Sequence, residues 1–236
     1  MNTLKHKVNI RGVMVPNDYK PYYDYFGEDS TCPRDVQKVI DAMADDDEVE
    51  VYINSPGGVI DVGSEIYTLL KGKKCSIYIT GEACSAASIV AMAGYCEMSP
   101  TALMMVHCVS SCQRGNHSDM EHMAEVLSTA DKALCSAYVE KAKMSEEEAL
   151  KMMEYETWLT AKEAKERGLI DKIMFEDERK EDIAFVAGPM FSLPTKEQME
   201  KVNKMINDEP KSKKEDDGSF LIQQKLDFLK LKGELR

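Results

Sequence analysis

Apolar and polar positions alternate between strand-like and helix-like stretches over the first 175 residues. Residues 7–14 alternate apolar and polar side chains, as a half-buried strand does. Apolar runs predict further strands at 48–54, 76–80, 103–107 and 170–175, and helical spacing predicts helices at 33–44 and 62–70. Residues 16–30, rich in Tyr, Gly and Asp, predict a loop with packed or interfacial aromatics. The alternating order predicts an α/β fold with parallel strands joined by crossover helices.

A long helix is predicted over residues 115–143, where apolar residues fall close to the helical period. Two further helices are marked by capping-box spacing, Ser145 with Glu148 and Thr160 with Glu163. By its spacing alone, this amphipathic helix would pack along its own domain.

The composition changes after about residue 176. Residues 176–182 are charged, and Lys, Glu and Asp dominate 195–218, which cannot bury enough apolar surface to fold alone. Residues 220–235 have the spacing of a short amphipathic helix. The sequence therefore predicts a folded domain over 1–175 and a flexible, charged extension over 176–236. The extension could dock a partner, be processed by self-cleavage, or only aid solubility.

Charge and composition exclude several classes of protein. The formal net charge of −12 disfavours nucleic-acid binding, which needs clustered Lys and Arg. No apolar run approaches the ~18 residues needed to span a bilayer, and the polar N-terminus has no secretory signal. The seven cysteines are scattered and odd in number, so they predict reduced thiols and a cytoplasmic protein. No second ligand pair follows Cys108 and Cys112, so no metal site is expected.

The candidate chemistry lies at Ser85 and His107. Ser85 stands where an apolar strand runs through small residues into a helix, and His107 ends the next apolar strand. Backbone N–H groups at a helix start can stabilise an oxyanion, and a histidine can take the proton of a serine hydroxyl. The pattern predicts a serine hydrolase. Ser85 could instead cap the helix, His107 could be an ordinary half-buried histidine, and Ser88 is the rival nucleophile.

Four motifs in this order resemble the ClpP-type serine peptidases over residues 8–175. They are the stretches 52–58 (YINSPGG), 81–85 (GEACS), 104–107 (MMVH) and 158–164 (WLTAKEA), the last followed by 168–171 (GLID). The continuation over 86–94 and the Met98-Ser99-Pro100 stretch look most like the phage and prophage branch, whose members are usually regarded as head-maturation proteases.

The resemblance implies a role for each matching residue. Ser85 falls on the nucleophile and His107 on the general base. Gly58 and Ala86 fall on the two residues whose backbone N–H groups form the oxyanion hole. No cofactor is implied.

The third member of the triad departs from the family. The family has an Asp two residues before the aromatic of its last motif, and here Glu156 stands two residues before Trp158. Glutamate is one methylene longer but serves as the third member in other triads. Glu154 and Asp171 are the alternatives.

The implied fold is a spiral of β-β-α units, shared with the crotonases, with residues 115–143 as a protruding handle helix. The implied function is a serine endopeptidase acting on polypeptides inside a homo-oligomeric ring, a heptamer or stacked heptamers. It would cleave phage capsid, portal or other head proteins, or else serve a hexameric Clp-type ATPase. A crotonase-fold acyl-CoA enzyme and an inactive ring-forming scaffold are the lesser alternatives.

Overall fold

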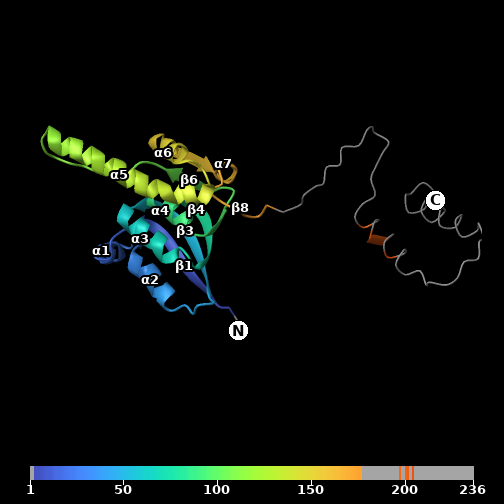
Figure 1. Ribbon diagram of the computed structural model, residues 1–236. Coiled ribbons are helices and arrows are strands. Elements are labelled where there is room, and N and C mark those ends of the chain that lie inside the picture. The colour runs from blue at the N-terminus through green and yellow to red at the C-terminus, as the bar shows by residue number, and fades with distance from the viewer. Residues whose placement is uncertain (1–2, 177–196, 198–199, 202–203, 205–236) are drawn as a thin grey trace, which may run out of the picture. The chain divides into compact units, whose positions relative to one another are not determined.

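The computed structural model describes residues 3–176 together with Glu197, Glu200, Lys201 and Lys204. Within this part the strands are β1 (Lys5–Met14), β2 (Ser30–Thr31), β3 (Glu48–Gly58), β4 (Lys74–Cys84), β5 (Tyr95–Met98), β6 (Leu103–Val106), β7 (Thr157–Thr160) and β8 (Lys172–Ile173). The helices are α1 (Lys20–Phe26), α2 (Pro33–Asp41), α3 (Ile60–Leu70), α4 (Ala86–Ala91), α5 (His117–Ala142), α6 (Glu146–Glu154) and α7 (Ala161–Glu166). Figure 1 shows their arrangement.

The described strands form one sheet that branches at β4. Its main path runs β2-β1-β3-β4-β5-β8, and every neighbouring pair on this path is parallel. The early part of β4 pairs with β5, and its end, Glu82–Cys84, pairs with β6. The pairing of β6 with β7 is antiparallel. The end of β4, which leads into Ser85, is therefore held beside β6, which leads into His107.

The core lies between this sheet and the helices packed on it. Side chains of β3 alternate, so that Val49, Val51 and Ile53 are fully buried while the residues between them are half-buried. The buried stripes of α2 and α3 belong to the same apolar cluster. Alternation in strands and 3.6-residue spacing in helices thus put one apolar face of each element into a common core.

The long helix α5 is buried over only part of its length. Met120 and Val126, in its N-terminal half, are 40% and 44% exposed, whereas Cys135, Ala137 and Tyr138 are buried. In Figure 1 the N-terminal part of α5 extends beyond the other helices. This arrangement fits the predicted protruding handle, and the predicted α/β fold class is confirmed.

The predicted elements differ from the structure in four places. The predicted loop at 16–30 contains α1, which ends at Gly27 with a left-handed φ of +69°, and Ser30, the first residue of β2. The short strands β5 and β7 were not predicted, because four residues carry little periodicity. The predicted last strand, 170–175, is reduced to β8.

Both predicted capping boxes are confirmed. The backbone N–H of Glu148 donates to the Ser145 hydroxyl over 3.2 Å, while the Ser145 N–H donates to the Glu148 carboxylate over 3.0 Å. Thr160 and Glu163 make the same reciprocal pair. The predicted extension over 176–236 lies almost entirely outside the described residues, so the division into two parts stays a prediction. No helix in the described part is long and apolar enough to cross a membrane.

Candidate active site

The turn from β4 to α4 holds Ser85 in an uncommon backbone conformation. Its φ is +55° and its ψ is −126°, a region that non-glycine residues rarely occupy. The Ser85 N–H donates to the Met105 carbonyl over 2.8 Å, which ties the turn to β6. Ser85 occupies the N-cap position of α4, but its side chain makes no capping hydrogen bond. A serine on a sharp strand-to-helix turn presents its hydroxyl away from the backbone, as nucleophilic serines do.

His107 follows β6 directly and meets that hydroxyl. Its Nε2 atom lies 2.7 Å from Ser85 Oγ, although the two residues are 22 positions apart in the chain. The parallel pairing of β4 with β6 brings them together. At this distance the imidazole can accept the hydroxyl proton directly.

Ser88, the rival nucleophile, is not available to a substrate. Its side chain is fully buried, and its hydroxyl donates to the Ser85 carbonyl over 2.6 Å. The same oxygen lies 2.7 Å from the hydroxyl of Tyr138 on α5. The structure therefore pairs His107 with Ser85 and places Ser88 behind it.

Gly57 and Gly58 bring the end of β3 against the turn that carries Ser85. Gly57 has a φ of +93°, and a side chain there would lie 2.5 Å from the Cys84 carbonyl oxygen and 2.8 Å from Ser85 Cβ. At Gly58, with a φ of +152°, a side chain would lie 2.2 Å from the Met14 carbonyl oxygen. Only glycine allows this close approach. The backbone of this loop can therefore lie beside a carbonyl that Ser85 attacks.

Ser55 holds the loop in place, a role that the sequence analysis missed. Its buried hydroxyl donates to the Gly12 carbonyl over 2.6 Å and accepts from the Gly57 N–H over 3.1 Å. Serine two residues before a turn residue commonly makes such a bond, and this spacing was the available signal. Ser55 thus links β1 to the backbone next to the Ser85 turn.

Glu156, the predicted third member of the triad, precedes β7, and His107 follows β6, the strand with which β7 pairs. Val106, the residue before His107, pairs with Thr157, the residue after Glu156, while the Cys108 N–H donates to the Met153 carbonyl over 3.2 Å. Glu156 has a φ of +45°, and its carboxylate accepts a 3.3 Å hydrogen bond from the Trp158 indole. Within residues 3–176 no hydrogen bond joins Glu156 to His107.

The two alternative acids differ in their surroundings. Asp171 accepts the Cys96 N–H over 2.7 Å and pairs with the ammonium group of Lys141, so it ties α5 to β5. Glu154 lies at the C-terminal end of α6. A further acid, Asp131 on α5, accepts the Val109 N–H over 2.6 Å and so fixes the segment that follows His107.

Cys84 precedes Ser85 but does not compete with it. Burial, together with the nearby Glu82 carboxylate, raises the pKa of the Cys84 thiol to about 12. The thiol therefore stays protonated near neutral pH, and the thiol form is a poor nucleophile.

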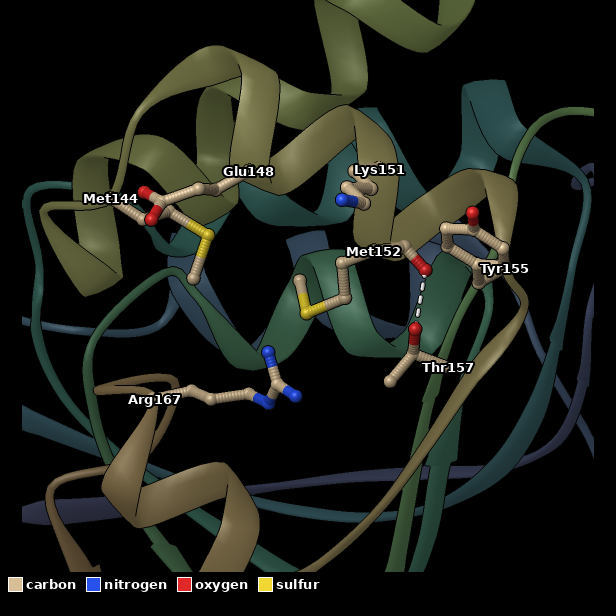
Figure 2. A pocket seen from close by; sticks show the side chains of 7 residues that line it. All are labelled: Met144, Glu148, Lys151, Met152, Tyr155, Thr157 and Arg167. Atoms are coloured by element: carbon tan, nitrogen blue, oxygen red, sulfur yellow. Dashed lines mark hydrogen bonds between the residues drawn. The ribbon is translucent and has the colours of Figure 1, made fainter.

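A pocket beside α6 and α7 is separate from these residues (Figure 2). It has a volume of about 390 Å³ and is lined by Met144, Glu148, Lys151, Met152, Tyr155, Thr157 and Arg167. The Thr157 hydroxyl donates to the Met152 carbonyl over 2.6 Å at its edge. Neither Ser85 nor His107 lines this pocket, so its position does not suggest a part in the chemistry.

Fold and site together define a class of protein. The branched parallel sheet is that of a ClpP/crotonase-like α/β fold, and a serine paired with a histidine at the ends of two adjacent strands has the geometry of a serine hydrolase.

The chain matches the family model described as Clp protease over residues 36–177, which is more than half of its length. It therefore belongs to the Clp protease family, and the resemblance to ClpP-type serine peptidases is confirmed. Members of this family are peptidases, generally of the serine type, that act on polypeptides and typically form rings.

Proposed function

We propose that this chain is a serine endopeptidase with Ser85 as nucleophile and His107 as general base. The observation that carries the proposal is the 2.7 Å contact between Ser85 Oγ and His107 Nε2 at a turn with a φ of +55°. The family membership supports the reaction class, and the full burial of Ser88 supports the choice of serine.

The reaction follows from these positions. Ser85 Oγ attacks the scissile carbonyl carbon while its proton passes to His107 Nε2. The carbonyl oxygen becomes an oxyanion, which the N–H groups of Gly58 and Ala86 stabilise. The C–N bond then breaks as His107 gives its proton to the leaving amine. A water molecule releases the acyl group by the same steps, and His107 again moves the proton.

Glu156 is proposed as the residue that orients the free nitrogen of His107. The proposal is supported by the strand register, which pairs Val106 with Thr157, the neighbours of His107 and Glu156, and by the left-handed φ of Glu156. This role requires a side-chain rotation that releases the carboxylate from the Trp158 indole. Trp158 is 51% exposed, so its indole could bond to water instead.

The biological setting that we propose is cytoplasmic maturation of a phage head, in which the ring cleaves capsid or portal proteins. Support comes from the phage-like sequence over residues 86–94 and from the long charged extension. Coexpression with a phage capsid protein tests this setting. Wild-type chain should shorten the capsid protein and Ser85→Ala should not. Intact capsid protein, with casein degraded only when a hexameric ATPase is added, would favour the ATP-dependent alternative.

The catalytic assignment is tested by labelling the purified full-length chain with a fluorophosphonate and measuring its intact mass. Wild type should gain one adduct, which Ser85→Ala should lose completely and His107→Gln should slow by orders of magnitude. Ser64→Ala, at an exposed serine of α3, is the matched control and should label like wild type. An adduct that persists in Ser85→Ala, or no adduct in wild type, would refute the assignment.

A further inference from the structure

Two buried hydroxyl groups connect the long helix α5 to the turn that carries Ser85. Ser88 is 0% exposed and Tyr138 is 1% exposed, and their oxygens lie 2.7 Å apart. Ser88 also contacts the Ser85 carbonyl twice, through its hydroxyl at 2.6 Å and its backbone N–H at 2.9 Å. The Ser85 carbonyl is thus held from the interior of the domain by a hydrogen-bonded chain.

The direction of each hydrogen bond in this chain is fixed by chemistry. A carbonyl oxygen can only accept a hydrogen bond, so the single hydroxyl proton of Ser88 is donated to the Ser85 carbonyl. The Tyr138 hydroxyl must therefore donate to Ser88. Burial raises the pKa of Tyr138 far above its ordinary value, so the phenol remains a donor over the whole working range of pH.

The last acceptor in this series of hydrogen bonds, the Ser85 carbonyl, shares its peptide group with the Ala86 N–H. The Ser85 carbonyl and the Ala86 N–H belong to one planar trans peptide and point in opposite directions. Ala86 begins α4, so its N–H has no acceptor within the helix. A side chain at Gly57 would lie 3.0 Å from the Ala86 nitrogen, which places this N–H beside the glycine loop, the Gly57–Gly58 end of β3.

We propose that Tyr138 and Ser88 form a relay that orients and polarises the Ala86 N–H for oxyanion binding. The inference rests on the proposed function, because it assigns this N–H to the oxyanion hole. Donors to the carbonyl withdraw electrons from the peptide and strengthen its N–H as a donor, since hydrogen bonds in a chain reinforce one another. The same bonds fix the tilt of the peptide plane. Tyr138 and Ser88 are positioning residues that do not contact the substrate.

The magnitude of the effect follows from the bond that the relay strengthens. Loss of an oxyanion donor costs about 10²- to 10³-fold in kcat, and each cooperative bond changes its neighbour by about a tenth to a third. Ser88→Ala should therefore lower kcat and the rate of fluorophosphonate labelling by roughly two- to eightfold, and Tyr138→Phe, one bond further from the peptide, by up to about twofold. KM should be unchanged, because the oxyanion forms only in the transition state.

A matched control distinguishes loss of the relay from the effect of removing any tyrosine hydroxyl that contacts α5. The Tyr67 hydroxyl donates to Glu140 over 3.2 Å and likewise links α3 to α5, but it has no path to Ser85. Tyr67→Phe should label at the wild-type rate. In a Ser88→Ala background, Tyr138→Phe should cause no further loss, because the relay is already interrupted. Thermal unfolding of each variant shows that the compared proteins are folded.

Each outcome is decisive. A Tyr138→Phe rate equal to that of Tyr67→Phe, in a wild type that labels at Ser85, overturns the relay and leaves the peptidase assignment standing. The same holds if KM rises while kcat is unchanged. Should Ser88→Ala fail to fold, the comparison of Tyr138→Phe with Tyr67→Phe still decides. A wild-type chain that does not label refutes the proposed function and the relay with it.

Discussion

Substitution of Gly57 by alanine tests whether close backbone approach builds the site. The new Cβ would lie 2.5 Å from the Cys84 carbonyl oxygen and 2.8 Å from Ser85 Cβ, so the turn must move. Ordinary contact needs about an ångström more, and a misplacement of about 1 Å costs roughly 100-fold in rate. The left-handed φ of +93° adds about 1–2 kcal/mol of strain. We therefore expect about a 100-fold slower reaction from Gly57→Ala.

The assay compares two alanine variants with similar backbone strain. Gly72 has a φ of +82°, but nothing lies within 4 Å of a side chain placed there. Gly72→Ala should lose about 1–2 kcal/mol of unfolding free energy and keep the wild-type rate of fluorophosphonate labelling. The ratio of the two labelling rates then measures the steric effect on the Ser85 turn alone. Labelling of Gly57→Ala within a few-fold of Gly72→Ala would refute the reasoning.

Three further predictions concern the loop, the third acid and the N-terminal strand. Ser55→Ala should lower the free energy of unfolding by about 1–3 kcal/mol, measured by urea unfolding, because the buried Gly57 N–H loses its acceptor. Glu156→Gln should lower kcat by about 100-fold or more if its charge stabilises the imidazolium, and an unchanged kcat would identify a dyad. Hydrogen bonds from the Ala44 N–H, the His6 side chain and the Leu4 N–H lower the pKa of Asp47 in the folded protein. The ionised carboxylate therefore stabilises the fold fully above about pH 4, and this stabilisation is lost as the pH falls. The melting temperatures of wild type and Asp47→Asn should therefore converge in acid, and a constant difference would contradict this.

The sequence was most informative where a local rule sets the structure. The boxes at Ser145 and Thr160 were predicted from spacing alone, because the partners lie three residues apart and need no tertiary contact. Strands and helices with regular apolar periods were predicted for the same reason. The helix α1 and the strands β5 and β7 were missed, since elements of seven and four residues provide little periodicity.

The candidate site divides in the same way. Ser85 and His107 were predicted because each stands at the end of an apolar strand within a recognisable motif. Their 2.7 Å contact, in contrast, depends on the pairing of β4 with β6 across 22 residues of chain. Only the spacing before Gly57 marked Ser55, and the Tyr138 hydroxyl gave no signal, because a buried tyrosine looks like any other in sequence.

By itself the sequence determined the fold class, the approximate positions of most elements and the candidate residues for the chemistry. Those features depend on spacing within a few residues, where backbone geometry is fixed. Only the tertiary structure decided that Ser88 is buried, that Ser55 anchors the glycine loop, and that the Glu156 carboxylate turns to Trp158. These outcomes depend on strand register and on packing between distant segments. The partner of each of these side chains is a residue or surface that only the folded chain brings close to it.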